Sequence, residues 1–356
     1  MNIHLYFNKY ENYYNISKLI FILSLLYIYL LIGNNLNDIK KKRPKISIFL
    51  PIYNKENFVI NSIKSLQNQT LKDIEIVAVN DCSTDRSLEI LTNLSKSDSR
   101  IKVVNNDKNH GLLYSRAMGI LNSSGEYLLN LDPDDMINGQ DTLEFLYNKA
   151  KIDNLDIISF NVFDQKHKRI IKCKEKNNIV RQPKLFLSIF RNDRIREYII
   201  VNKLIKKEIL LSAYEDFKDK IYNGKWNYFE DNIWNILVNK YAQSRLCINR
   251  LVYIYTFNKN SLMNDKYGYY QFQNLIYRHE MFEKLFTSKN DQKYLNGEYY
   301  YLLNKLRSNI KSLLLLNEKS INDKIIYIFK LFLNKNNVSI STTNKINNFL
   351  NRISIN

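Results

Sequence analysis

The chain has 356 residues, 45% of them hydrophobic, which is enough apolar material for a sizeable core and excludes wholesale disorder. Its formal net charge is +18, and such an excess favours anionic partners such as nucleotide phosphates or acidic lipid headgroups. The basic residues are scattered along the chain. Compositional drift toward Asn, Lys, Ile and Tyr therefore explains the positive charge as well as an anionic partner does. We find no nucleic-acid recognition motif and expect no nucleic-acid partner.

The cysteines and histidines argue against a disulfide scaffold and against a zinc site. Cys82, Cys173 and Cys247 form no CxxC pair, and an odd number of cysteines in a chain of this size predicts reduced or buried thiols, with a disulfide between two of them as the alternative. The four histidines show neither HxxxH nor HExxH spacing.

Residues 19–33 form an uncharged apolar run, LIFILSLLYIYLLIG, which Ile16 and Ser17 extend across the single charge of Lys18. The run is short beside the roughly 20 residues that a membrane-spanning helix needs. We favour a single-pass membrane anchor, while a cleaved signal peptide and a buried helix stay open. A basic cluster at 40–45 follows, so the positive-inside rule predicts the bulk of the chain in the cytosol, with an endomembrane lumen as the alternative.

Beyond residue 44, apolar runs alternate with segments of helical periodicity. The runs predict buried strands at 45–52, 74–79, 101–104 and 127–131. Helices are predicted between them at 57–68, from near Ser83 to Leu94, and at 112–121. Strands separated by helices of this length indicate an α/β fold, with a mostly parallel sheet flanked by helices. Ligands of such sheets bind at the carboxyl ends of the strands.

The pattern changes after about residue 155. We predict extended segments at 156–163 and 246–257, and helices at 184–190, 206–214 and 230–241. The remainder is rich in Tyr, Leu, Asn and Lys and is expected to be mainly helical. The predicted organisation is an anchor and basic linker (1–44), one α/β domain (45–265) and a helical C-terminal extension (266–356).

Three acidic clusters stand at predicted element ends: Asp81 after the second strand, DPDD (Asp132, Asp134 and Asp135) after the fourth, and Glu230–Asp231 at the start of a helix. A lone carboxylate in such a place is usually a helix cap or turn former. Three carboxylates within four positions repel one another unless a cation compensates them. Hard divalent cations take carboxylates together with substrate phosphates, so DPDD predicts a metal–diphosphate site; a type I turn with Pro133 in second position is the alternative.

Four ordered blocks resemble the glycosyltransferases of family 2: SIFLPIYNKENFV, SLQNQTLKDIEIVAVNDCSTDRSLEIL, NHGLLYSRAMGI and GEYLLNLDPDDMI. The resemblance continues more thinly through NKLIKKEIL, YFEDNIWNILV and YIYTFNKNSLMN, and covers about residues 45–265. It implies the Rossmann-like GT-A fold and an inverting sugar transfer, of hexosyl type, from a nucleotide-sugar donor, with UDP favoured. It also implies a DxD motif that binds Mn²⁺ or Mg²⁺.

The resemblance assigns roles residue by residue. Pro51, Tyr53 and Glu56 would shape the pocket for the base, and Asp81 would hydrogen-bond that base. Asp132 and Asp134 would face the ribose and the metal, with Asp135 as a further ligand or an orienting group. Asp231 would be the general base, with stabilisation of the helix N-terminus as the alternative. Glu230 would be a helix cap or an acceptor-orienting group, and Arg116 a donor contact or a surface salt bridge.

The sequence leaves the acceptor open among a glycan, a lipid-linked molecule and a protein. It departs from the family pattern at Cys82, where a glycine is usual, and this puts the geometry of the donor loop in question. One rival interpretation is a non-catalytic protein of the same fold that binds sugar nucleotide or glycan. A nucleotidyltransferase is a second rival, although neither GxGxxG nor GxxxxGK occurs.

Overall fold

The computed structural model describes residues 23–24, 43–173, 178–182, 184–185, 200–221 and 230–258. The chain divides into two compact units, 1–43 and 44–356, and all the elements named below belong to the second. Within the described ranges, no helix is both long and apolar enough to cross a membrane. The predicted anchor lies outside these ranges apart from helical Leu23 and Ser24, and so does the predicted C-terminal extension.

The first half of the domain alternates strands and helices as predicted: β1 (Ile46–Ile52), α2 (Val59–Gln67), β2 (Ile74–Asn80), α3 (Ser87–Ser97), β3 (Ile101–Asn105), α4 (Leu112–Asn122) and β4 (Tyr127–Asn130). The predicted start of α3 near Ser83 is wrong by four residues. Ser83 and Asp85 lie in the preceding loop, where their side chains accept hydrogen bonds from the backbone N–H groups of Asn54 and Glu56.

The second half contains β5 (Met136–Ile137), α5 (Thr142–Ile152), β6 (Ile157–Asp164), β7 (Arg169–Ile171), β8 (Ile179–Arg181), β9 (Lys203–Lys206), α7 (Lys207–Ile221), α8 (Glu230–Tyr241) and β10 (Ser244–Tyr255). The predictions of β6, α7, α8 and β10 are confirmed, with α7 longer than expected. The short strands β5, β7, β8 and β9 were not predicted. Only Lys184 and Leu185 of the predicted helix at 184–190 are described, and both are helical.

The strands form one sheet in the order β3-β2-β1-β4-β9-β6-β10-β5, with β7 paired to β6 and β8 to β10. The pairs from β3 to β4 are parallel. Strand β9 runs antiparallel to both β4 and β6, whereas β6 and β10 are again parallel to each other. Among the described residues four strand pairs are parallel and five are antiparallel, so the sheet is mixed and not mostly parallel as predicted. Its β3-β2-β1-β4 part is parallel throughout, and the carboxyl ends of β1, β2 and β4 lie along one edge.

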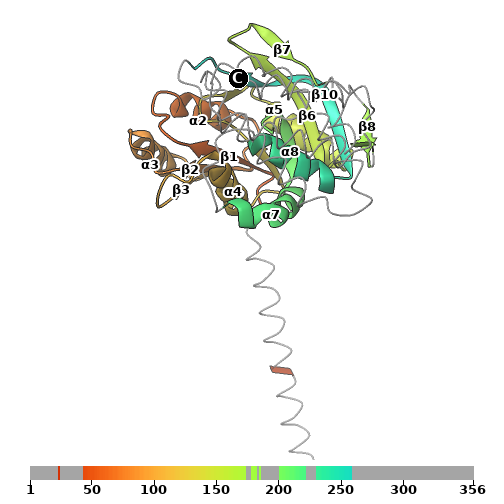
Figure 1. Cartoon of the computed structure of the whole chain (residues 1–356), viewed down its shortest axis with the longest axis horizontal. Coiled ribbons are helices and arrows are strands. Elements are labelled where there is room, and N and C mark those ends of the chain that lie inside the picture. Colours follow the sequence, from red (N-terminus) through yellow and green to blue (C-terminus); the bar gives the residue numbers. More distant parts are fainter. Residues whose placement is uncertain are drawn as a thin grey trace, which may run out of the picture. The chain divides into compact units, whose positions relative to one another are not determined.

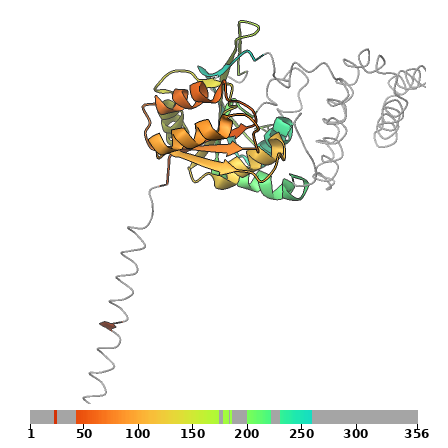
Figure 2. The ribbon, with the colours of Figure 1, turned by 90° about the vertical axis from the view of Figure 1, so that its left-hand side faces the viewer.

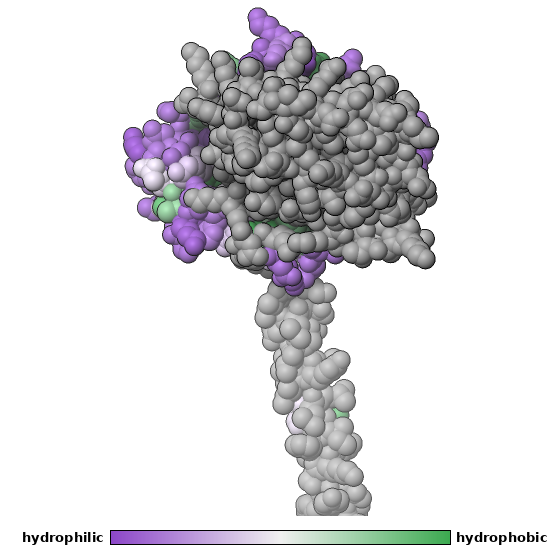
Figure 3. Space-filling model, in the orientation of Figure 1, coloured by the Kyte–Doolittle hydropathy of each residue, from purple (hydrophilic) through white to green (hydrophobic). Residues whose placement is uncertain are grey.

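Helices cover both faces of the sheet, and each face has its own hydrophobic core (Figures 1 and 2). Alternate residues of β1 separate the two: Ile48 and Leu50 pack with α2, α3 and α5, while Phe49 packs with α4, α7 and α8. Gly119 lets α4 approach β1 closely, because a Cβ there would lie 2.7 Å from the ring of Phe49. The surface visible over α3 is mostly hydrophilic (Figure 3).

Cys173 and Cys247 form a disulfide with their Cα atoms 5.8 Å apart, so the expectation of unpaired thiols is wrong for these two. Cys247 lies on β10 and Cys173 follows β7, both of which pair with β6. Their sequence separation of 74 leaves no local spacing signal. Cys82 is free and exposed, and its φ of 57° is the left-handed conformation that glycine usually supplies.

Candidate active site

The loops that follow β1 and β2 hold each other in place. The backbone N–H of Lys55 donates to Ser87 Oγ (2.8 Å), and that of Glu56 donates to Asp85 Oδ2 (3.0 Å). In return, Glu56 Oε2 accepts a hydrogen bond from the Arg86 backbone N–H (2.9 Å). Glu56, predicted to shape the base pocket, therefore ties two loops together at the sheet edge.

Asp81 follows β2 directly and is buried, with 3% of its surface exposed. Its Oδ1 accepts from Asn106 Nδ2 (2.8 Å) and from the His110 backbone N–H (3.0 Å), and its Oδ2 accepts from the Gly111 backbone N–H (2.8 Å). A carboxylate offers about four acceptor sites, so Oδ2 keeps capacity for one more donor. The carboxylate thus fixes the entry of α4.

Of the other predicted base-pocket residues, Pro51 is buried in β1 and Tyr53 is exposed just beyond it. Their positions at the end of β1 agree with the expected edge of the sheet. Their role in the base pocket stays a prediction.

Asp132 is the first carboxylate after β4. Its Oδ1 accepts from Arg116 Nη2 (3.2 Å) and from Asn130 Nδ2 (3.0 Å), and its backbone N–H donates to the hydroxyl of Tyr253 (3.1 Å). The side chain remains 27% exposed. It is therefore oriented from one side and open to a ligand on the other.

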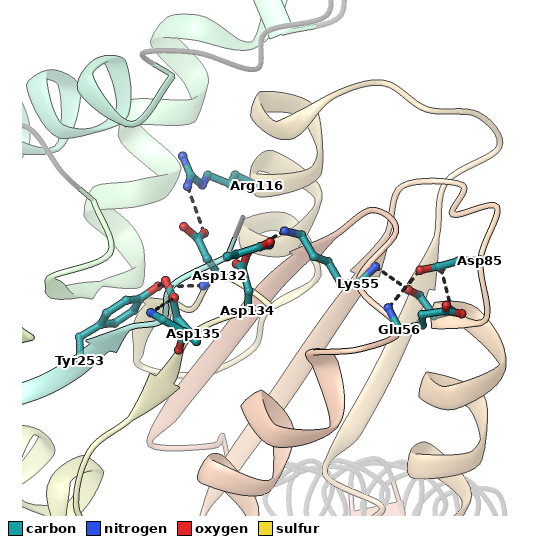
Figure 4. Close-up of polar contacts among 11 residues, drawn as sticks. Lys55, Glu56, Asp85, Arg116, Asp132, Asp134, Asp135 and Tyr253 are labelled. Atoms are coloured by element: carbon teal, nitrogen blue, oxygen red, sulfur yellow. Dashed lines mark hydrogen bonds and ion pairs between the residues drawn. The ribbon is translucent and has the colours of Figure 1, made fainter. Parts of the chain in front are cut away.

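Asp134 faces a cation of the protein itself (Figure 4). Its Oδ2 accepts from Lys55 Nζ at 2.6 Å and from Asn258 Nδ2 at 2.9 Å, and 16% of its side chain is exposed. Lys55 comes from the loop after β1, and Asn258 follows β10. This carboxylate joins three segments that are distant in sequence.

Asp135 is buried, with 1% of its surface exposed. Its Oδ2 accepts from the Tyr253 hydroxyl (2.6 Å) and its Oδ1 from the Thr256 backbone N–H (2.8 Å) (Figure 4). Burial, reinforced by the charges of Asp132 and Asp134, raises the pKa of the Asp135 carboxyl well above its usual range. This arrangement matches the orienting role better than the metal-ligand role.

Arg116 is buried on α4 and connects the carboxylates of β4 with those of α8. Its Nη1 lies 2.5 Å from Glu230 Oε1 and its Nη2 lies 3.2 Å from Asp132 Oδ1. The guanidinium is 4% exposed, so the expectation of a surface salt bridge is wrong. Burial disfavours its charge, but Glu230 and Asp132 outweigh that effect and raise the pKa of Arg116.

Glu230 and Asp231 open α8. Burial raises the pKa of the Glu230 carboxyl to about 7, although Arg116 acts in the opposite direction. Asp231 is half-buried, and its charge acts on both Arg116 and Glu230. Glu230 of the predicted catalytic pair and Asp132 of the three predicted metal ligands are thus joined through one guanidinium.

The contacts also involve residues to which the sequence assigned no role: Lys55, Tyr253 and Asn258. All three lie within blocks that resemble the family, SIFLPIYNKENFV and YIYTFNKNSLMN. Neither Lys55, four residues before α2, nor Tyr253, on the last strand, carries a local sequence signal of its partner. The partners lie 79 and 118 residues away in sequence.

Asp132 and Asp134 have the chemistry to hold a hard divalent cation. In the part of the chain that the structure describes, no three acidic, histidine or cysteine side chains gather closely enough to hold a metal ion. A magnesium-type site commonly takes one or two carboxylates and completes its shell with substrate phosphates and water. Asp134 already has an ammonium group against its oxygen, so positive charge is stabilised at that point.

A mixed sheet flanked by helices, with a parallel β3-β2-β1-β4 part and carboxylates at the ends of β2 and β4, is typical of a GT-A-type α/β domain. Residues 47–211 match the sequence model of glycosyl transferase family 2. This part of the chain is a family 2 glycosyltransferase domain.

Curated relatives and solved structures agree with this assignment. The uncharacterized glycosyltransferase EpsJ of Bacillus subtilis is 31% identical over 63% of this chain and 64% of its own length. The cholesterol galactosyltransferase of Borreliella burgdorferi is 31% identical over 65% of this chain and 61% of its own length. The chain therefore spans less than two thirds of either relative. A crystal structure of S. aureus TarS 1–349 in complex with UDP-GlcNAc shares the fold, with a TM-score of 0.60 and 20% identity over 80% of this chain and 79% of that one.

Proposed function

We propose that the chain is an inverting, divalent-metal-dependent glycosyltransferase of hexosyl type that moves a sugar from a nucleoside-diphosphate donor to an acceptor hydroxyl. One observation carries the proposal: Arg116 joins the carboxylates at the end of β4 to those at the start of α8. The carboxylates after β4 have the chemistry to bind a metal ion that carries a diphosphate, and the carboxylates at the start of α8 have the chemistry to accept a proton. Their connection through one buried side chain supports a single site with two functions.

We assign the donor as a UDP-sugar. The fold is shared with a protein crystallised with UDP-GlcNAc, and that likeness supports UDP as the nucleotide. On this chain the base would lie between the loops after β1 and β2, bordered by Pro51, Tyr53 and Glu56. Asp81 Oδ2, which has one donor in the structure, has acceptor capacity for an N–H of the base.

The residues divide the chemical work as follows. Asp231 accepts the proton of the acceptor hydroxyl as that oxygen attacks the anomeric carbon from the face opposite the leaving group. Glu230 and Arg116 keep the groups around the Asp231 carboxylate in fixed positions. Asp134 and Asp132 would hold Mn²⁺ or Mg²⁺, which when bound offsets the charge of the departing diphosphate. Asp135, through Tyr253, holds the DPDD turn in shape.

We further propose that residues 16–33 attach the chain to a membrane as a single-pass anchor with the domain in the cytosol. The composition of that run and the basic cluster at 40–45 support the proposal. A membrane-attached enzyme meets lipid-linked or membrane-proximal acceptors first, so we assign the acceptor to this class, ahead of free glycans and proteins.

The proposal is tested by measuring hydrolysis across UDP- and GDP-sugars, with and without Mn²⁺. We expect turnover of one UDP-sugar that requires metal and falls on the order of 100-fold in Asp134→Ala, the scale seen when one charge-stabilising group is removed. Asp231→Asn should keep metal-dependent UDP binding and lose transfer. Asp141→Ala is the matched control, because Asp141 is 64% exposed and pairs with Arg250 outside the site.

Donor binding without turnover in any donor–acceptor combination would favour the non-catalytic interpretation. Absence of binding to every donor would refute the metal–diphosphate assignment of Asp132 and Asp134.

A further inference from the structure

The Lys55–Asp134 ion pair lies within the donor site and has no role in the function proposed above. The two side chains come from loops after neighbouring strands, β1 and β4, and meet at 2.6 Å. The backbone of Lys55 is anchored, since its N–H donates to Ser87 Oγ (2.8 Å). Only the flexible stem and the ammonium group extend from this fixed point toward Asp134 (Figure 4).

Two side-chain cations contact the two open carboxylates of the DPDD turn, and they differ in freedom. Arg116 is 4% exposed and binds both Asp132 and Glu230, so its displacement would leave its own charge and that of Glu230 buried without compensation. Lys55 is 22% exposed, and its ammonium is a compact charge on four rotatable carbons. Of these two cations, Lys55 is the one that can leave its carboxylate at small cost.

The Lys55 ammonium contacts the same carboxylate oxygen, Asp134 Oδ2, that the proposed function gives to a divalent cation. A metal ion arriving alone must displace this ammonium and leave it without a partner. A metal arriving with a nucleoside diphosphate brings anionic oxygens to which a displaced lysine can move. The two ligands should therefore assist each other's binding.

Resting on that proposed function, we propose that Lys55 is a displaceable counter-ion of the donor site. In the free protein it neutralises Asp134; when metal and nucleotide bind together it transfers to the diphosphate. Lys55 thereby disfavours metal without nucleotide and couples the two ligands. By linkage, each raises the affinity of the other by the same factor.

The test uses the full chain and four proteins: wild type, Lys55→Met, Lys55→Arg and Lys64→Met. Lys64 is an exposed residue of α2, so its replacement changes the net charge equally without touching the site. Mn²⁺ binding is followed by the electron paramagnetic resonance of free Mn²⁺, with and without UDP, and UDP binding is followed by calorimetry in Mn²⁺. Thermal unfolding of each variant checks that it is folded.

We expect Lys55→Met to bind Mn²⁺ alone about fivefold more tightly and to bind UDP in Mn²⁺ about fivefold more weakly, from the lower end of usual coupling energies. Lys55→Arg, which keeps the charge, should keep the coupling between metal and UDP. Lys64→Met should match the wild type in both measurements.

Opposite signs for the two ligands are the decisive feature. If Lys55→Met tightens both Mn²⁺ and UDP, the lysine only repels the metal, and transfer to the diphosphate is refuted. Unchanged affinities for a folded Lys55→Met would refute the counter-ion role altogether. If the wild type binds neither Mn²⁺ nor UDP, the proposed function itself fails, which is a separate outcome.

Discussion

Replacement of Arg116 by Met should destabilise the domain by an amount that depends on pH. The change removes the charge that lies 2.5 Å from Glu230 and 3.2 Å from Asp132. Asp132 is 27% exposed and can be rehydrated, whereas Glu230 is 6% exposed and cannot. Breaking a buried pair by removing one partner costs about 3–5 kcal/mol when the remaining group stays charged. Glu230 therefore sets the cost.

The pH dependence follows from the carboxyl of Glu230. Its pKa of about 7 in the folded protein exceeds the roughly 4.3 of an unfolded glutamate, so the folded state binds more protons between these values. Stability from this group is present below about pH 4.3 and is lost as pH rises through 7. Without Arg116, which acts to lower this pKa, the folded pKa rises further and the loss at high pH grows.

We therefore expect Arg116→Met to cost about 3–5 kcal/mol at pH 8, where Glu230 is charged. At pH 5.5 Glu230 is protonated, and the cost should fall to the about 1–3 kcal/mol of an unpaired neutral group. Urea unfolding followed by tryptophan fluorescence measures both values, and Trp234, which is buried on the same helix as Glu230, contributes to that signal.

Two further variants test the reasoning. Arg116→Met/Glu230→Gln removes both charges and should be more stable than Arg116→Met at pH 8. Arg100→Met is the matched control, because Arg100 and Asp98 form a more exposed pair (22% and 12%) that is expected to contribute at most about 1 kcal/mol. An equal loss at both pH values, or no recovery in the double variant, would refute a buried charge on Glu230 as the cause.

Two other predictions concern the turn and the N-terminus. Tyr253→Phe removes the hydroxyl that donates to Asp135 and accepts from the Asp132 backbone N–H. It should lower the free energy of unfolding in urea by about 1–3 kcal/mol and weaken Mn²⁺-dependent UDP binding. Unchanged UDP binding would contradict the role of Tyr253 in shaping the turn. Removal of residues 1–43, one of the two compact units, should release the chain from membranes and preserve donor hydrolysis; a truncated chain that stays membrane-bound would refute the anchor.

Local sequence patterns were sufficient to predict the strands that are themselves long apolar runs. Buried parallel strands are continuous apolar runs, so β1 and β2 could be located from KISIFLPI and IEIVAV. Strand β9 could not, because KLIK is short and carries a lysine at each end, and it is a strand only by pairing with both β4 and β6. The Cys173–Cys247 disulfide could not be predicted either, because only long-range strand pairing brings the two cysteines close together.

The sequence predicted which acidic residues belong to the candidate site, but it did not predict the contacts that connect them. The clusters at 132–135 and 230–231 were visible because acidic residues at element ends are conspicuous. Their connection through Arg116 was not, since its two partners lie 16 and 114 residues away in sequence. The role of Asp135 also depended on Tyr253, a residue that reads in sequence as one more apolar position of a strand.

Both acidic clusters show the same division between a buried carboxylate and a more exposed neighbour. Asp135 is 1% exposed and anchored by Tyr253, while Asp134 beside it is open to solvent and held by a displaceable lysine. Glu230 is likewise buried and anchored by Arg116, while Asp231 beside it is half-buried.

The buried member of each pair is fixed by a side chain from another element, so it can orient its neighbour but has little room for a ligand. The open member keeps access to ligands because its neighbour carries the packing. Asp134→Ala and Asp231→Asn should therefore lose turnover with little change in unfolding free energy. Arg116→Met and Tyr253→Phe, which release the buried members, should lose both.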